Sequence, residues 1–227
     1  MLKIIADDFG LADCINDGII YLLTAGKING AALMANGAAF DDAVTKIKSA
    51  AVSNLTIGAH LVLVEEKSLS GVTLPANYKI FFIKYLLGLI KLAEIEREAR
   101  TQLDKIIRSG IQPQFINSHQ HLHLLPGIIN IIIKLAKEYN INYIRLVNEP
   151  FNFGVGKVRR KLPLLYLRWL SKLAANKIKQ AKLSSNDLFI GFVNAGNLTK
   201  SYLEYANHIS RQYPQATVEL GCHPGFA

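Results

Sequence analysis

The chain has 227 residues, of which 50% are hydrophobic, and it carries a formal net charge of +9. This size and apolar content are ordinary for one α/β domain, so we expect a single domain over residues 1–227. The widely separated Cys14 and Cys222 show neither redox nor metal spacing, and Asp7 and Asp8 interrupt the N-terminal apolar run too early for a secretory signal. Neither observation suggests an oxidising compartment or export, so we expect a cytoplasmic protein.

Short apolar runs alternate with longer segments of helical pattern along the chain. We expect strands at residues 2–6, 31–35, 55–59, 114–117, 143–146, 188–193 and 217–222. We expect helices at residues 13–25, 40–51, 78–109, 126–139, 163–183 and 198–213. Asp13 is expected to cap the first helix and Gly110 to stop the long third one. This βα alternation predicts a parallel sheet.

The most membrane-like run covers residues 80–92, but Lys84 and Lys91 interrupt it. It is also shorter than the ~20 apolar residues that a membrane-spanning helix needs. We therefore expect an amphipathic or buried helix at this position.

Unusual polar residues lie at or directly after the carboxyl ends of the predicted strands, one group for each strand. In chain order they are Asp7 with Asp8, Asn36, His60, His119, Arg145, Asn194 and His223. Barrel enzymes build their sites from the carboxyl ends of several strands, whereas a doubly wound sheet usually carries a glycine-rich phosphate turn, which is absent here. The sequence therefore predicts a distorted or incomplete (β/α) barrel, TIM-barrel-like, with about seven parallel strands.

Residues 116–123 hold three of the six histidines, at positions 119, 121 and 123. Imidazole is a common metal ligand, and alternate residues of an extended segment face one side. One ion rarely takes three ligands from so short a segment, so we expect one ligand here, His119. His121 and His123, together with Arg145 and Asn36, are then expected to contact substrate. A polar strand end beside the core is the alternative interpretation.

The types of residue that converge indicate metal-assisted hydrolysis. Asp8, His60 and His119 offer one carboxylate and two imidazoles, which leaves open positions for water and substrate. Asp7 is the expected base and His223 the expected acid for the leaving group. Each also has a structural interpretation: paired aspartates cap helices, a histidine can be buried in a core, and a histidine before Pro-Gly can anchor a turn.

Five segments together carry a resemblance to a known family. They are residues 4–11 (IIADDFGL), 58–61 (GAHL), 117–123 (NSHQHLH), 145–150 (RLVNEP) and 222–225 (CHPG). In this order they resemble the YdjC-like carbohydrate deacetylases, which include chitooligosaccharide deacetylases and hopanoid-biosynthesis-associated deacetylases, and residues 186–191 look closer to the second group. The resemblance implies a distorted barrel, one divalent metal ion (Mg²⁺ or Zn²⁺) and removal of acetyl groups from N-acetylated sugars or glycolipids. It assigns the same roles to the ligands, the base and the acid.

Two departures from the family pattern concern the site. Asn117 stands where many relatives have aspartate, so the supporting hydrogen bond expected next to the ligands comes from an amide. The chain ends at Ala227, whereas relatives continue through roughly one more βα unit. We therefore expect a truncated C-terminus, with the barrel wall incomplete there.

Residues 157–182 contain nine Lys or Arg and no acidic residue, interspersed with leucines, Tyr166 and Trp169. The pattern predicts either weak contact with an anionic membrane surface or a solvated basic helix. No nucleic-acid-binding motif accompanies the charge, so nucleic acid is not an expected partner. A homodimer is left open. Two further functions are also left open, namely another metal-dependent hydrolase such as a phosphodiesterase, and a non-catalytic protein that binds sugar or lipid.

Overall fold

The computed structural model describes residues 1–50, 55–150 and 160–226. Within them the strands are β1 Leu2–Phe9, β2 Gly30–Leu33, β3 Thr56–Leu61, β4 Phe115–Ser118, β5 Tyr143–Ile144, β6 Leu188–Ile190 and β7 Val218–Cys222. The helices are α1 Asp13–Thr24, α2 Phe40–Ser49, α3 Tyr78–Leu86, α4 Leu92–Arg108, α5 Ile128–Glu138, α6 Lys161–Gln180 and α7 Lys200–Gln212, with the 3₁₀ helix η1 His119–Leu124. Strands and helices alternate, as the sequence predicts.

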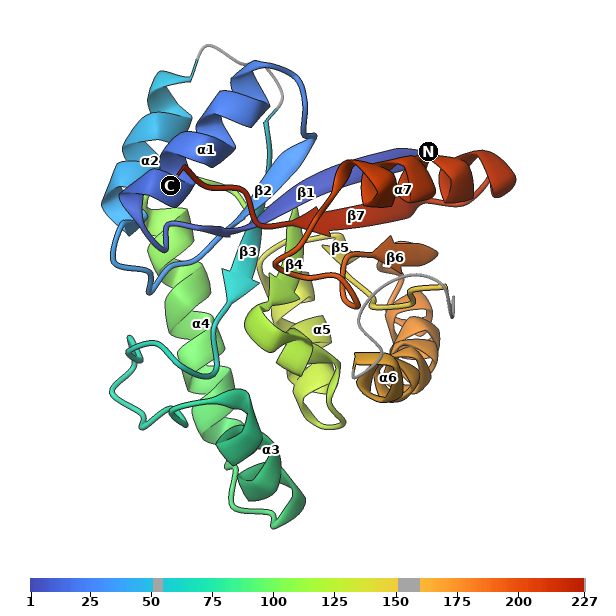
Figure 1. Ribbon diagram of the computed structural model, residues 1–227. Coiled ribbons are helices and arrows are strands. Elements are labelled where there is room, and N and C mark those ends of the chain that lie inside the picture. Colours follow the sequence, from blue (N-terminus) through green and yellow to red (C-terminus); the bar gives the residue numbers. More distant parts are fainter. Residues whose placement is uncertain (51–54, 151–159, 227) are drawn as a thin grey trace.

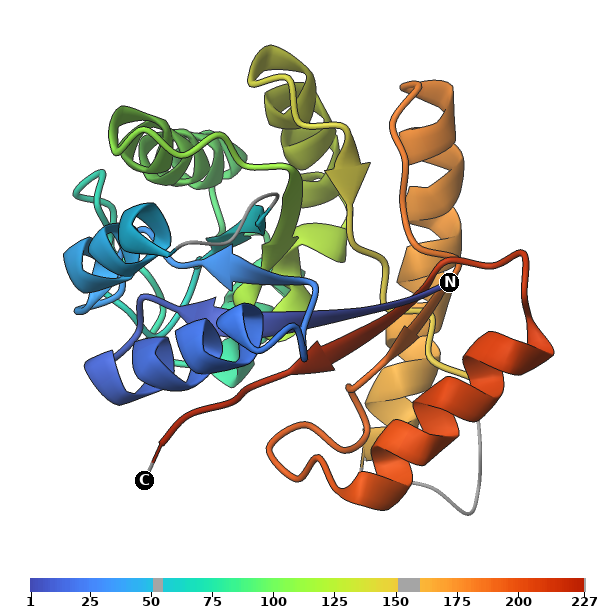
Figure 2. The same ribbon diagram turned by 90° about the horizontal axis from the view of Figure 1, so that it is seen from above.

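The seven strands form one parallel sheet in the order β5-β4-β3-β2-β1-β7-β6. Figures 1 and 2 show that it curls into an open half-barrel, with β1 near its middle and the helices packed around it. Among the described residues the edge strands β5 and β6 are not paired with each other, and Ser184 makes one isolated bridge to Tyr143 beside β5. The prediction of an incomplete (β/α) barrel is confirmed.

Apolar periodicity explains how the helices pack. In α4, buried Ile95, Ala99, Leu103 and Ile106 recur at helical spacing and form one stripe in the main core. This helix ends beside Gly110, whose φ of +84° suits glycine, and the predicted stop is confirmed.

Three sequence-based expectations about the helices are wrong. The helix expected over residues 78–109 is two helices, α3 and α4, because the chain turns at Gly88 with φ +69°. The helix expected at residues 80–92 to be amphipathic or buried is neither, because Phe81 is the one buried residue of α3 and its exposed side carries large apolar side chains such as Ile83 and Leu86. Asp13 is the first residue of α1 and does not cap it; the capping position is Ala12, whose side chain makes no hydrogen bond.

No helix among the described residues is long and apolar enough to cross a membrane. The first three residues of the basic segment predicted at 157–182 lie outside the described residues, and the rest of it forms α6 and the turn that follows.

Candidate active site

A bulge in β1 brings two neighbouring aspartates into one site. In a regular strand Asp7 and Asp8 would point to opposite faces of the sheet. Here the pairing of β1 with β2 shifts between Ala6 and Phe9, and Asp8 takes a left-handed φ of 62°. Asp7 then hydrogen-bonds Asn117, while Asp8 lies 3.2 Å from ring nitrogens of His60 and His119. The strand runs through Phe9, three residues beyond its predicted end.

Asp8, His60 and His119 come from β1, the end of β3 and the residue after β4. Each offers one ligand atom, and these atoms all lie within 4.8 Å of one another. The distances from Asp8 Oδ1 to His60 Nε2 and to His119 Nδ1 are both 3.2 Å. This is the one such group found among the described residues that could hold a metal ion, and it consists of the three residues that the sequence indicated.

Asn117 connects the ligand side of the site to Asp7. Its Nδ2 donates to Asp7 Oδ1 at 2.9 Å, and its Oδ1 lies 2.7 Å from His60 Nδ1. An ionised carboxylate only accepts hydrogen bonds, so the amide nitrogen must face Asp7 and the amide oxygen must face His60. The proton of His60 is therefore on Nδ1, and the lone pair of Nε2 points towards the ligand group.

Arg145 holds the other oxygen of Asp7. Its Nη1 donates to Asp7 Oδ2 at 2.5 Å, and its Nε donates to Glu219, which also accepts from the Tyr143 hydroxyl. The guanidinium is fully buried, and its Nη2 has no partner among the described residues. Burial alone would raise the pKa of Asp7, but the charge of the neighbouring Arg145 guanidinium lowers it well below its usual range.

His119 lies between two carboxylates. Its Nδ1 faces Asp8, and its Nε2 is 3.0 Å from Glu65 Oε2. Burial lowers the pKa of His119, but the hydrogen bond to Asp8 and then Glu65 raise it, to about 9 overall. Burial raises the pKa of Asp8, but the hydrogen bond with His119 and the proximity of the His60 ring outweigh burial and hold this pKa well below its usual range.

Glu65 is a residue of the site that the sequence analysis missed. It lies four residues after β3 with φ +75°, an uncommon conformation for glutamate. Acidic side chains in a loop are ordinary, and neither spacing nor periodicity separates Glu65 from its neighbour Glu66. Only the folded chain places this carboxylate against His119.

His223 follows β7 and faces the same group from another direction. Its Nε2 lies 3.9 Å from Asp8 Oδ2, and its side chain is 39% exposed. Of the predicted proton carriers, Asp7 is buried and held by two partners, whereas His223 is open to solvent.

The residues predicted to contact substrate do not all lie in the same surroundings. His123 is fully buried, and its ring nitrogens lie 2.8 Å from Ser118 Oγ and 2.9 Å from Arg145 O, so neither faces the site. Burial lowers its pKa to about 4. Gln120 and His121 adopt left-handed φ angles in η1, so the strand-like alternation expected of the three histidines is wrong. His121 contacts the rings of Phe189 and Phe192.

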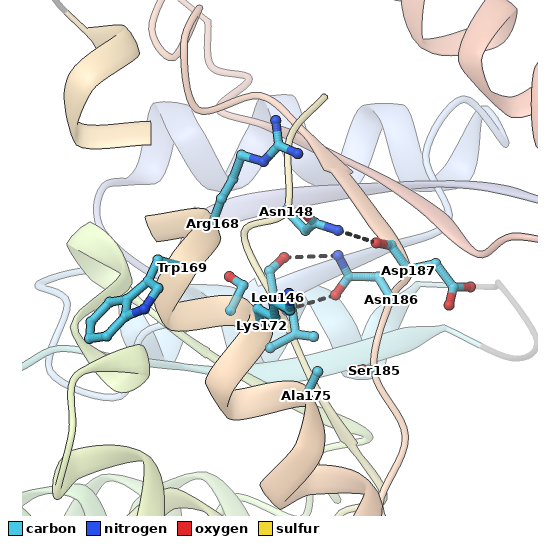
Figure 3. Close-up of a pocket in the computed structure, with 10 residues that line it drawn as sticks. Leu146, Asn148, Arg168, Trp169, Lys172, Ala175, Ser185, Asn186 and Asp187 are labelled. Carbon is cyan, nitrogen blue, oxygen red and sulfur yellow. Dashed lines mark hydrogen bonds between the residues drawn. The ribbon is translucent and has the colours of Figure 1, made fainter. Parts of the chain in front are cut away.

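Asn36 lies after β2, where its Nδ2 donates to Lys67 O at 3.1 Å and its Oδ1 is buried with no partner among the described residues. A cavity of about 420 Å³ lies elsewhere, between α6 and the segments after β5 and before β6 (Figure 3). Asn186, in its wall, bonds the backbone of Leu146. None of the candidate ligands lines this cavity.

Comparison with known proteins shows which family the chain resembles. A family model described as YdjC-like protein matches residues 1–227. The chain is 35% identical to a carbohydrate deacetylase of Brevibacillus brevis over 163 residues, which are 70% of this chain and 63% of that protein. It is 34% identical to a carbohydrate deacetylase of Clostridium beijerinckii over 224 residues, covering 97% and 80% of the two chains.

A crystal structure from Enterococcus faecalis, provisionally described as a cellobiose-phosphate cleavage protein, shares the fold. Its TM-score is 0.71 at 22% identity, over 100% of this chain and 81% of that one. The match to the Brevibacillus relative spans less than two thirds of that protein's length. With a family model that matches its whole length and relatives above 30% identity, the chain belongs to the YdjC-like family.

Proposed function

We propose that this protein is a metal-dependent hydrolase that removes acetyl groups from N-acetylated sugars. The observation that carries the proposal is the convergence of Asp8, His60 and His119 beside a buried aspartate, Asp7, at the carboxyl ends of the strands. Relatives of the chain are named carbohydrate deacetylases, which supports the reaction class and a sugar substrate.

The ligand group fits a divalent cation. His60 Nε2 is buried and makes no hydrogen bond among the described residues, although its lone pair points at Asp8. Asp8 and Glu65 face only imidazoles within this group, so a bound cation would balance their charge. Two imidazoles and one carboxylate suit Zn²⁺ on ligand type and also admit Mg²⁺. When bound, the ion would acidify a water and polarise the acetyl oxygen.

Asp7 is the proposed base. Its oxygens accept from Asn117 and Arg145, which fixes the carboxylate at the site and keeps it ionised. A carboxylate has about four acceptor positions, so each oxygen retains capacity for the proton of an attacking water. We assign Arg145 the role of positioning residue for Asp7, because it is buried behind this carboxylate.

His223 is the proposed acid. It is the more exposed of the two proton carriers and faces Asp8 at 3.9 Å. A protonated imidazole there would deliver its proton to the departing sugar amine as the bond from nitrogen to the acetyl carbon breaks. Asn36 and His121 remain proposed contacts for the sugar.

The test is acetate release from N-acetylglucosamine oligomers by chelator-treated protein, with and without added Zn²⁺ or Mg²⁺. We expect release only with metal. His119→Ala should lose both bound metal and acetate release, while His208→Ala, an exposed histidine on α7, should keep both.

Other outcomes would favour the remaining functions. Metal-dependent cleavage of bis(p-nitrophenyl) phosphate without acetate release would indicate a phosphodiesterase. Sugar binding without either reaction would indicate a non-catalytic relative. Full metal content in His119→Ala would overturn the ligand assignment.

A further inference from the structure

We propose that α3 and α6 together form a docking surface for an anionic lipid bilayer. The proposal goes beyond the proposed function, because it concerns a part of the molecule that contains none of the candidate ligands or proton carriers.

The two helices are neighbours in space although about 80 residues separate them in sequence. The ring of Phe82 on α3 meets the ring of Tyr166 on α6 at a centroid distance of 5.9 Å, edge to face. Tyr166 in turn stacks on Trp169 at 5.9 Å. The aromatic contacts therefore join the outer sides of both helices into one surface.

Large apolar side chains are exposed on both parts of this surface. On and just after α3 they include Ile83 at 58%, Leu86 and Leu87 at 67% and Leu89 at 63%. On α6 they include Leu162 at 77%, Leu165 at 48%, Trp169 at 54% and Leu173 at 43%. Scattered exposed leucines are normal, but a cluster of this kind marks an interaction site.

The helix α3 is unusual in being apolar on its outer side as well. Phe81 is fully buried and anchors its inner side, while Ile80, Ile83 and Leu86 face outward without cover from the described residues. A helix that is apolar all round needs an apolar neighbour on each side. The Tyr85 hydroxyl donates to Pro126 O and ties α3 to the segment that follows η1.

The charge of this surface identifies the partner. Residues 67–93 contain Lys67, Lys79, Lys84 and Lys91 and no Asp or Glu, and residues 160–182 contain seven Lys or Arg and again no Asp or Glu. On α6, Arg168 and Lys172 border the 420 Å³ cavity and Trp169 projects beside them (Figure 3). Among the described residues, no acidic side chain pairs with Lys79, Lys84, Arg168 or Lys172 in an ion pair. Exposed leucine and tryptophan beside free cations match the composition of helices that lie in an anionic lipid interface.

The same charges disfavour a second copy of the chain as the occupant. Two copies of this face would bring lysines and arginines of one against those of the other, with no acidic residue on either α3 or α6 to offset them. An anionic bilayer offers both the apolar layer and the opposite charge.

Trp169 makes the proposal testable without a label, because it is the only tryptophan of the chain and is half exposed on this surface. Full-length protein is mixed with vesicles of phosphatidylcholine alone or with 30% phosphatidylglycerol, at low and high salt. We expect a blue shift of tryptophan emission and co-sedimentation only with anionic vesicles at low salt. Neutralising Arg168 and Lys172 with glutamine should weaken binding by roughly fivefold for each charge.

A second variant separates apolar insertion from charge. Ile83→Ser with Leu86→Ser leaves the charge unchanged and should abolish the shift, whereas Leu203→Ser, at an exposed leucine on α7, should not affect it. Thermal unfolding and acetate release from a water-soluble sugar check that each variant is folded. Equal binding to neutral vesicles, no shift with any vesicle, or a shift that depends on protein concentration without lipid would each overturn the proposal.

Discussion

Asp7 and Asp8 are neighbours on β1, yet each carboxylate belongs to a different group of side chains. Asp7 accepts from Asn117 and from Arg145, whose guanidinium also bonds Glu219. Asp8 is surrounded by His60, His119 and His223, with Glu65 behind His119. The first group, the Asp7 group, contains its own cation. The second, the Asp8 group, contains none apart from imidazoles that can take up protons.

This difference separates two uses of buried charge. A charge group that is paired inside the protein holds strands together, and removing one partner leaves the others buried and uncompensated. A buried group of acceptor atoms that face one another raises the free energy of the folded protein until a cation binds among them. Such a group is therefore suited to bind a cation. The two kinds of group are built around consecutive residues of β1, Asp7 and Asp8.

The largest expected effect is on stability, in the Asp7 group. Arg145→Met should lower the free energy of unfolding by about 3–5 kcal/mol, because it leaves Asp7 and Glu219 buried without their cation. Urea unfolding measures it. Lys134→Met, which breaks the exposed pair with Glu96, is the control and should cost less than about 1 kcal/mol. Similar losses for the two variants would contradict the distinction between the groups.

The second prediction separates catalysis from metal binding. Asp7→Asn should lower turnover by about 10²–10⁴-fold, since an amide cannot accept the proton, while bound metal stays near the wild-type level. Acetate release and elemental analysis of the same sample give both quantities. Loss of metal together with activity would mean that Asp7 belongs to the Asp8 group.

The sequence predicts the strands and the candidate metal ligands, but not how the two aspartates are divided between the Asp7 group and the Asp8 group. Alternation of apolar runs located the seven strands, and the position of polar residues after them indicated Asp8, His60 and His119 as ligands. The sequence could not predict that Asp7 and Asp8 join different groups of side chains. This depends on a bulge with Asp8 at φ 62°, and local sequence does not specify such a conformation for a non-glycine residue.

Contacts over long distances in sequence were also out of reach. Arg145 was expected to touch substrate, but it lies beneath Asp7, 138 residues away. Glu65 meets His119 across 54 residues. The break between α3 and α4 needed only Gly88 in a left-handed conformation, but a glycine inside a helical pattern does not by itself distinguish a tolerated residue from a turn.

The third prediction concerns pH in the metal-free protein. His119 has a pKa raised to about 9, mainly by Asp8 against the effect of burial, so its contribution to stability is full below its ordinary pKa of 6.5. That contribution is lost as pH rises through about 9. The free energy of unfolding of the wild type and of His119→Gln is measured with urea in the presence of a chelator. The difference between the two proteins should shrink by up to roughly 3 kcal/mol as pH rises through this window. A difference that stays constant with pH would show that the proton is not held by the Asp8 group.

The smallest expected effect tests the link between the groups. Asn117→Ala removes the acceptor of the His60 Nδ1 proton and should weaken metal affinity by about 10–100-fold. Asn117→Asp keeps an acceptor at this position and should bind metal more tightly than the alanine variant. Titration with a competing chelator ranks the three proteins. Equal affinities would show that Asn117 does not fix the tautomer of His60.

The central place of β1 has a consequence for how the site comes into being. β1 is paired on one side with β2 and on the other with β7, and the Met1 ammonium donates to Ala216 O, 215 residues away. During synthesis, β1 must wait with one edge unpaired until β7 has left the ribosome, which is the slow, long-range step expected of parallel sheets. Asp8 can meet His60 and His119 earlier, whereas His223 joins them only after β7 docks. The three candidate ligands can therefore come together in the nascent chain before β7 pairs with β1.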